Sequence, residues 1–204
     1  MTSDARVDSP LVFGFLTVVQ QPSQGLVGGY LLLNAQARPL EFHCTAPVRA
    51  SRTQEILYGP TLEPFLYGEQ IGRTLFQACQ QQPTAIFTDR PAALSAAEHV
   101  TAPVWLVLND EAASTADPQA SGATNVTAAV AALAPAVNFR ADTAHKSVAA
   151  MHALRCGAYR LACRAEDAGR GVEDRIEAAV ATFDLQEPFE RIRAAIDESQ
   201  RGAR

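Results

Sequence analysis

Three apolar segments joined by short turns stand at the start of the chain, before any segment with a helical pattern. Residues 13–20 are β-branched and aromatic, residues 21–25 have turn composition, and residues 26–34 resume the apolar run. A second turn over residues 34–39 leads into a third run at residues 40–45. Connections this short leave no room for the crossover helix that parallel neighbours need. The chain is therefore expected to begin with an antiparallel meander, which indicates an α+β fold.

Helical signals follow the meander. Ser51 and Gln54 have the spacing of a capping box, and the first turn of a second helix can hold Pro64. Gly68 and Gly72 lie four residues apart inside that second helix. Each glycine disfavours a helix by about 1 kcal/mol relative to alanine. The pair therefore indicates either a close helix-to-sheet contact or a break in the helix.

Two further strands are expected over residues 84–88 and 103–108, and they complete the first unit of the chain. The prediction is an α+β core domain over residues 1–109, with an antiparallel sheet of about five strands and helices on one face. Residues 110–135 are rich in small and polar side chains and are expected to form a flexible linker. Residues 136–204 are expected to form a C-terminal helical segment.

The last helix carries an apolar stripe that needs a partner surface. Its apolar residues recur at spacings of three and four after a capping signal at Asp184. They are Leu185, Phe189, Ile192 and Ile196. The stripe can pack on the sheet of the first domain, or it can form a homodimer with a second copy of the chain.

Composition excludes several classes of function. The net charge of −5 and the scattered basic residues disfavour nucleic acid as a partner. No apolar stretch reaches the roughly 20 residues that span a bilayer, so no membrane partner is expected. The four cysteines include no C-x-x-C pair, which favours reduced thiols and a cytoplasmic location. No cofactor is expected.

Glu41 and His43 are the first candidates for chemistry. In a strand that turns Phe42 and Cys44 inward, Glu41 and His43 share the outer face and can form a hydrogen bond. A carboxylate beside an imidazole is a common arrangement for proton transfer. The predicted catalytic set is therefore Glu41 and His43, with Arg52 to hold an anion. The competing interpretation is a half-exposed histidine that only solvates the face of the sheet or packs under a helix.

The polar residues that surround this pair form a candidate ligand-binding surface. Tyrosine beside glycine places an amphipathic ring on permissive backbone, and arginines with carboxylates suit a phosphate or an acidic ligand. The candidates are Arg49, Glu55, Tyr58, Glu63, Tyr67, Glu69 and Arg73. Ordinary ion pairs on exposed helix faces explain the same residues.

A metal site is considered and set aside. On a helix over residues 142–169, His152 and Cys156 are the only pair spaced to chelate one ion. A complete site would need ligands from elsewhere, so a packing face is favoured and no metal is predicted.

Two functions remain. The sequence contains no nucleophile elbow, P-loop, dinucleotide fingerprint or H-E-x-x-H motif. This absence favours a non-catalytic module that binds a small ligand or a protein, or that assembles. The alternative is a small hydrolase or transferase that acts on an anionic substrate with His43 as the base.

Overall fold

The computed structural model describes residues 11–22, 24–108, 151–168, 171–180 and 184–201. These residues form one seven-stranded sheet in the order β3-β2-β1-β4-β5-β7-β6. The strands are β1 (Val12–Gln21), β2 (Gly25–Asn34), β3 (Pro39–Cys44), β4 (Ala85–Thr88), β5 (Val104–Leu108), β6 (Met151–Cys156) and β7 (Tyr159–Arg164).

The sheet is mixed. Strands β1, β2 and β3 form the antiparallel meander, whereas β4 pairs parallel with β1, and β5 pairs parallel with β4. The pair β6 and β7 then extends the sheet antiparallel to β5. The predicted α+β class, the meander at its start and the helix at its C-terminus are confirmed. The parallel centre arises because helical connections precede β4 and β5, which allows each to run in the direction of β1.

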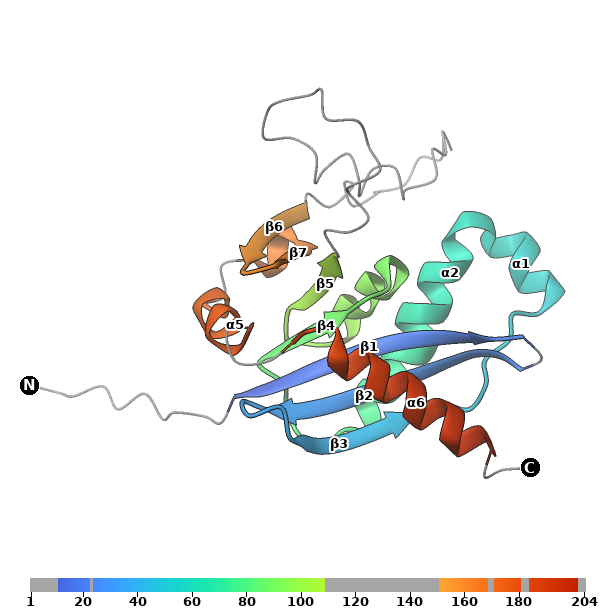
Figure 1. Ribbon diagram of the computed structural model, residues 1–204. Coiled ribbons are helices and arrows are strands. Elements are labelled where there is room, and N and C mark those ends of the chain that lie inside the picture. Colours follow the sequence, from blue (N-terminus) through green and yellow to red (C-terminus); the bar gives the residue numbers. More distant parts are fainter. Residues whose placement is uncertain (1–10, 23, 109–150, 169–170, 181–183, 202–204) are drawn as a thin grey trace, which may run out of the picture.

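Helical segments cover both faces of the sheet (Figure 1). The connection from β3 to β4 holds α1 (Arg52–Tyr58), η1 (Gly59–Thr61), α2 (Leu62–Pro64), the π-helix η2 (Phe65–Gly72) and α3 (Arg73–Ala78). The other segments are the 3-10 helices η3 (Pro91–His99) and η5 (Ala165–Asp167), with α5 (Glu173–Val180) and α6 (Glu187–Arg201).

Local sequence signals explain two features of the first connection. Ser51 caps α1, and both hydrogen bonds of the expected capping box to Gln54 are present. Gly68 lies in the π-helix, and a Cβ on it would stand 2.3 Å from the Ser95 hydroxyl oxygen. A Cβ on Gly72 would stand 2.7 Å from that of Ala96. The two glycines therefore permit a close contact, as expected, but with η3 and not with the sheet.

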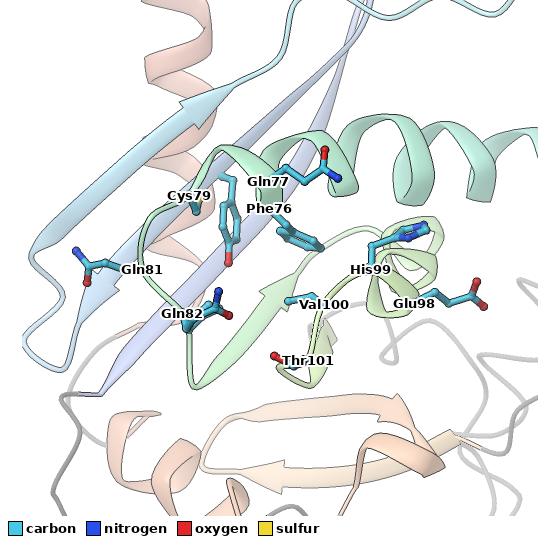
Figure 2. A pocket seen from close by; sticks show the side chains of 11 residues that line it. Phe76, Gln77, Cys79, Gln81, Gln82, Glu98, His99, Val100 and Thr101 are labelled. Carbon is cyan, nitrogen blue, oxygen red and sulfur yellow. The ribbon is translucent and has the colours of Figure 1, made fainter.

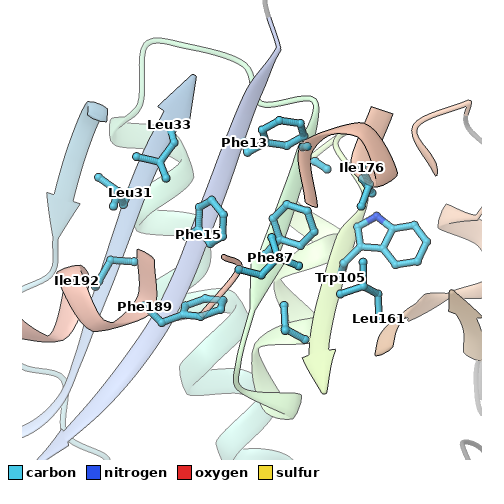
Figure 3. Packing of buried hydrophobic residues seen from close by; sticks show 14 of the residues in the cluster. Phe13, Phe15, Leu31, Leu33, Phe87, Trp105, Leu161, Ile176, Phe189 and Ile192 are labelled. Carbon is cyan, nitrogen blue, oxygen red and sulfur yellow. The ribbon is translucent and has the colours of Figure 1, made fainter. Parts of the chain in front are cut away.

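The face covered by α6 forms the larger apolar core (Figure 3). Phe15 packs against Phe87 on β4, with ring centroids 5.3 Å apart, and edge-on against Phe189 on α6, at 5.5 Å. Trp105 and Leu161 continue this core toward β7. The opposite face packs on η2, α3 and η3.

The apolar stripe of α6 is fully buried within the chain. Leu185, Phe189, Ile192 and Ile196 have no exposed surface, and α6 lies across β1 and β2 (Figure 1). Of the two alternatives expected for the stripe, packing on the sheet is confirmed, so the stripe is not available to form a homodimer.

The prediction of a helix over residues 142–169 is wrong for the residues of this range that the structure describes. Residues 151–164 form β6 and β7, and Gly157 turns the chain between them with a φ of 58°. A glycine at positive φ suits a two-residue hairpin turn. This turn decides the local conformation, although the spacing of His152 and Cys156 is that of a helix. The predicted linker over residues 110–135 lies outside the described residues, and the division into domains stays a prediction.

In the part of the chain that the structure describes, every helix is too short or too polar to cross a membrane.

Candidate functional site

The carboxyl end of β4 lies beside the middle of β1, and this place in the sheet defines the candidate site. Leu16 pairs with Thr88, so Asp89, the first residue after β4, lies level with Thr17 on β1. In sheets with parallel strands, ligands bind in the crevice outside the carboxyl ends of those strands. An acidic residue that directly follows a buried parallel strand is well placed to meet such a ligand.

Asp89 is held by neighbours from two other elements. The Thr17 hydroxyl donates a hydrogen bond of 2.6 Å to Asp89 Oδ1, and Arg193 on α6 donates from Nη2 to Asp89 Oδ2. The Asp89 side chain is only 12% exposed. Its carboxylate is therefore oriented by a hydroxyl and a guanidinium before any ligand arrives.

The two arginines beside Asp89 remain open to solvent. The Arg90 side chain is 43% exposed and lies 4.0 Å from Asp89, measured from Nε to Oδ2. Arg90 Nε has no hydrogen-bond partner among the described residues. The Arg193 side chain is 38% exposed, and its remaining N–H groups are oriented by the bond to Asp89. Two such guanidinium groups suit an anion with several oxygens, because each can donate two parallel hydrogen bonds.

Tyr67 and Glu63 border the site from the helical connection. Burial raises the pKa of the Tyr67 phenol, and the negative charges of Glu63 and Asp89 act in the same direction. The positive charge of Arg90 lowers that pKa and only partly compensates. The phenol therefore stays protonated at neutral pH and donates a hydrogen bond to Glu63. Both residues belong to the surface predicted from the sequence.

A hollow lies beyond the carboxyl end of β1. It encloses about 420 Å³ between the β1–β2 hairpin and α1, and it is lined by Arg49, Glu55 and Leu66 among others. The Arg49 Nε donates a hydrogen bond to the Gln24 carbonyl oxygen. Two more residues of the predicted surface therefore lie at this end of the sheet.

The remaining predicted ligand residues do not join these groups. Arg52, predicted to hold an anion, forms an exposed ion pair with Glu55 at 2.8 Å. The Tyr58 ring packs against Phe65, with centroids 4.3 Å apart. Glu69 and Arg73 are exposed. The predicted surface is therefore several separate groups, since a helical connection distributes neighbouring residues over different faces.

Glu41 and His43 form the expected hydrogen bond, with 3.1 Å between Glu41 Oε2 and His43 Nε2. Both face the helices that follow β3, because Glu41 also accepts hydrogen bonds from the backbone N–H groups of Gln80 and Gln81. Their catalytic role stays a prediction. Arg52 belongs to a different element and has no part in this cluster.

The expected inward side of β3 is exposed. Phe42 is 38% exposed, and Cys44 is exposed as well. The alternation of the strand is as expected, but β3 is the edge strand of the sheet, and α6 covers β1 and β2 more closely than β3. The prediction that Phe42 and Cys44 are buried is therefore wrong.

The exposure of Cys44 predicts the reactivity of the thiols. In the native protein we expect Cys44 to react quickly with an aromatic disulfide reagent at pH 8. Burial and the charge of Glu41 raise the pKa of Cys79 to about 12, so Cys79 reacts slowly, as do the buried Cys156 and Cys163. Absorbance should report one fast thiol, and all four after unfolding. A Cys44→Ser variant that keeps the fast phase would contradict this assignment.

The residues that the sequence analysis missed are Thr17, Asp89, Arg90 and Arg193. Thr17 sits inside an apolar run, and Asp89 has the composition of a turn with the residues that follow it. Arg193 is separated from Asp89 by more than a hundred residues. The one available signal was an acidic residue directly after a short apolar strand.

Comparison with known proteins finds a likeness in fold. No protein-family model matches the chain, and no curated protein sequence does either. Among solved structures, the chain is similar to endonuclease V of Ciona intestinalis, solved in complex with a 23mer DNA that contains an inosine followed by a ribo-adenosine. The TM-score is 0.50 at 11% sequence identity, over 97% of this chain and 88% of that one. The chain therefore has an endonuclease V-like fold.

This likeness corrects two expectations drawn from the sequence. The protein was expected to be a non-catalytic module for binding a small ligand or a protein, and nucleic acid was excluded as its partner. Both are overturned by a shared fold with an endonuclease solved on DNA. The net charge of −5 was a poor guide because it averages over the whole surface, whereas a ligand responds to local charges such as those of Arg90 and Arg193.

Proposed function

We propose that this protein binds nucleic acid at the carboxyl end of β4, beside the middle of β1, and hydrolyses its phosphodiester bonds as a nuclease-like enzyme. The observation that carries the proposal is Asp89, oriented by Thr17 and flanked by two solvent-accessible arginines. The endonuclease V-like fold supports it. The proposal keeps the alternative drawn from the sequence, a hydrolase for an anionic substrate, and assigns Asp89 as the base in place of His43.

The arginines account for substrate binding. Arg90 and Arg193 can each donate to the two non-bridging oxygens of a phosphodiester. Arg193 then divides its N–H groups between the phosphate and Asp89, which brings the carboxylate next to the phosphorus. The hollow lined by Arg49 offers a further contact for the backbone of the substrate.

Asp89 accounts for the chemistry. In this scheme a water molecule attacks the phosphorus, its proton passes to Asp89, and one ester P–O bond breaks. The leaving oxygen takes a proton from Tyr67, which its surroundings keep protonated, or from solvent. Asp89 belongs to no group of three or more metal-ligand side chains among the described residues. The scheme therefore assigns roles to protein side chains alone.

The test is cleavage of end-labelled DNA and RNA oligonucleotides by the purified chain. We expect Asp89→Asn to reduce the rate about 100-fold or more, because general-base catalysis contributes about 10²–10⁴. Arg193→Gln should weaken oligonucleotide binding in fluorescence anisotropy and reduce its salt dependence. Arg201→Gln is the matched control, since Arg201 lies on the same helix but pairs with the exposed Glu198 and not with Asp89 among the described residues.

Two outcomes would overturn the proposal. One is a chain that neither binds nor cleaves any DNA or RNA oligonucleotide at low salt. The other is cleavage that co-purifies with the chain but stays unchanged in Asp89→Asn, which would identify a contaminating nuclease or a different site.

A further inference from the structure

Three metal-ligand side chains meet between β3 and the end of α3, away from Asp89. Glu41, His43 and Cys79 each offer one ligand atom, and these three atoms lie within 4.8 Å of one another. They form the only such group among the residues that the structure describes. Glu41 and His43 share one face of β3, and Cys79 directly follows α3. Together they supply an oxygen, a nitrogen and a sulfur donor.

The carboxylate of this group is already oriented. The backbone N–H groups of Gln80 and Gln81 donate hydrogen bonds of 3.0 and 2.9 Å to the two oxygens of Glu41. These bonds also tie the backbone after Cys79 to β3, so they hold the sulfur donor beside the other two. Partners that orient a ligand in this way are typical of metal sites, where their loss weakens binding about 10- to 100-fold.

A buried hydroxyl without a partner lies beside the group. The Tyr30 side chain is 1% exposed, and its hydroxyl has no hydrogen-bond partner among the described residues. Burial raises the pKa of Tyr30, and Cys79 and Glu41 are close enough to raise it further. Such a hydroxyl is costly to bury unless something satisfies it.

A pocket of about 430 Å³ adjoins Cys79 and Tyr30 (Figure 2). Tyr30 and Cys79 form part of its wall, together with Phe76, Gln82 and His99. The His99 Nε2 is a second buried polar atom without a hydrogen-bond partner in the described part of the chain. The pocket therefore gives access to Cys79 and presents polar atoms that a bound water or small ligand would satisfy.

We propose that Glu41, His43 and Cys79 form a binding site for a thiophilic divalent cation of the zinc class. A tetrahedral zinc ion places its ligand atoms about 3.3–3.8 Å apart, given bonds of about 2.0–2.3 Å. The 3.1 Å separation of His43 Nε2 and Glu41 Oε2 is close to this range. Cys79 needs to approach by about 1 Å, given the 4.8 Å limit on the group. Three protein ligands leave a fourth position for water.

Binding of the cation releases one proton, from the thiol of Cys79. Burial and the negative charge of Glu41 keep Cys79 a neutral thiol in the metal-free protein. A divalent cation offsets both effects, so the thiol loses its proton to solvent and the thiolate binds the ion. The ion also takes the place of the hydrogen bond between His43 and Glu41.

The test uses Co²⁺ as a spectroscopic probe of the chelator-treated full chain, followed by competition with Zn²⁺. We expect one equivalent of Co²⁺ to produce a thiolate-to-metal charge-transfer band and the visible spectrum of tetrahedral cobalt, both removed by Zn²⁺. Cys79→Ser should abolish the charge-transfer band. His43→Gln and Glu41→Gln should each weaken binding about 100-fold or more, since even orienting partners contribute up to that factor.

Cys44 provides the matched control. It directly follows His43 but lies on the other face of β3 and is exposed, so it is the thiol that an adventitious ion would find first. Cys44→Ser should bind Co²⁺ as the unsubstituted chain does. Loss of the band in Cys44→Ser, or its retention in Cys79→Ser, would overturn the proposal, as would no binding at micromolar metal.

The site is independent of the proposed nuclease activity. Its residues come from β3 and from the residue after α3, and β2 and β1 separate β3 from β4 in the sheet. Asp89→Asn should therefore bind Co²⁺ normally. A chain that binds cobalt without cleaving nucleic acid would refute the proposed function alone, and the reverse result would refute only the metal site. Thermal unfolding of each variant shows whether its fold is intact.

Discussion

Replacing Phe189 by alanine is expected to lower the free energy of unfolding by about 3–5 kcal/mol, the range for truncating a buried phenylalanine. Phe189 is fully buried and packs edge-on against Phe15 at 5.5 Å (Figure 3). The truncation leaves a cavity between α6 and β1 that the rigid sheet cannot fill. Urea denaturation, followed by the change in tryptophan fluorescence, measures the effect, since Trp105 lies in the same core.

Glu190→Ala is the control for this change. Glu190 neighbours Phe189 on α6 but is exposed, so its truncation should alter the free energy of unfolding by no more than about 0.5 kcal/mol. Equal effects of the two substitutions would show that α6 is not anchored on the sheet through Phe189. The buried position of the apolar stripe would then need revision.

The meander was predictable because its signals are local. Two turns of characteristic composition separate three apolar runs, and each run pairs with the next one along the chain. The parallel pairing of β1 with β4 joins segments about seventy residues apart, and no local pattern reports it. The same limit explains why β6 and β7 were read as a helix, since the pairing of β7 with β5, and of β6 with β7, decides their conformation.

The candidate site was less predictable than the fold, for a related reason. Thr17, Asp89 and Arg193 come from three distant parts of the sequence, and only the parallel pairing of β1 and β4 with the packing of α6 brings them together. Glu63 and Tyr67 were found because they stand in a segment rich in polar side chains. The Glu41–His43 hydrogen bond was found because alternation along one strand is enough to predict it.

Two adjacent glycines on β2 set the distance of both helical layers from the sheet. A Cβ on Gly28 would stand 2.1 Å from Cγ2 of Ile71 in η2, and one on Gly29 would stand 2.3 Å from Cγ2 of Ile192 in α6. The side chains of consecutive strand residues point to opposite faces, so each glycine serves one layer. Their absent side chains therefore let both helical layers pack closely against the middle of the sheet.

This arrangement predicts a strong coupling between Gly29 and Ile192. Gly29→Ala is expected to destabilise the protein by about 1–3 kcal/mol through overpacking, although alanine is otherwise tolerated in strands. Ile192→Ala is expected to cost about 2–5 kcal/mol through the cavity it leaves. The double variant should lose less free energy of unfolding than the sum of the two single losses, by at least about 1 kcal/mol. The reason is that the new methyl group enters the space vacated by Ile192.

The control for the coupling is Gly29→Ala with Ile176→Ala. Ile176 on α5 is as fully buried as Ile192 and belongs to the same core, but it is not among the atoms nearest to a Cβ on Gly29. The effects of Gly29→Ala and Ile176→Ala on the free energy of unfolding should therefore add within about 0.5 kcal/mol. If the effects also add for Gly29→Ala with Ile192→Ala, α6 moves away from the sheet to make room for the added methyl group. The close approach of α6 to β2, on which the position of Arg193 beside Asp89 depends, would then be flexible and not imposed by packing.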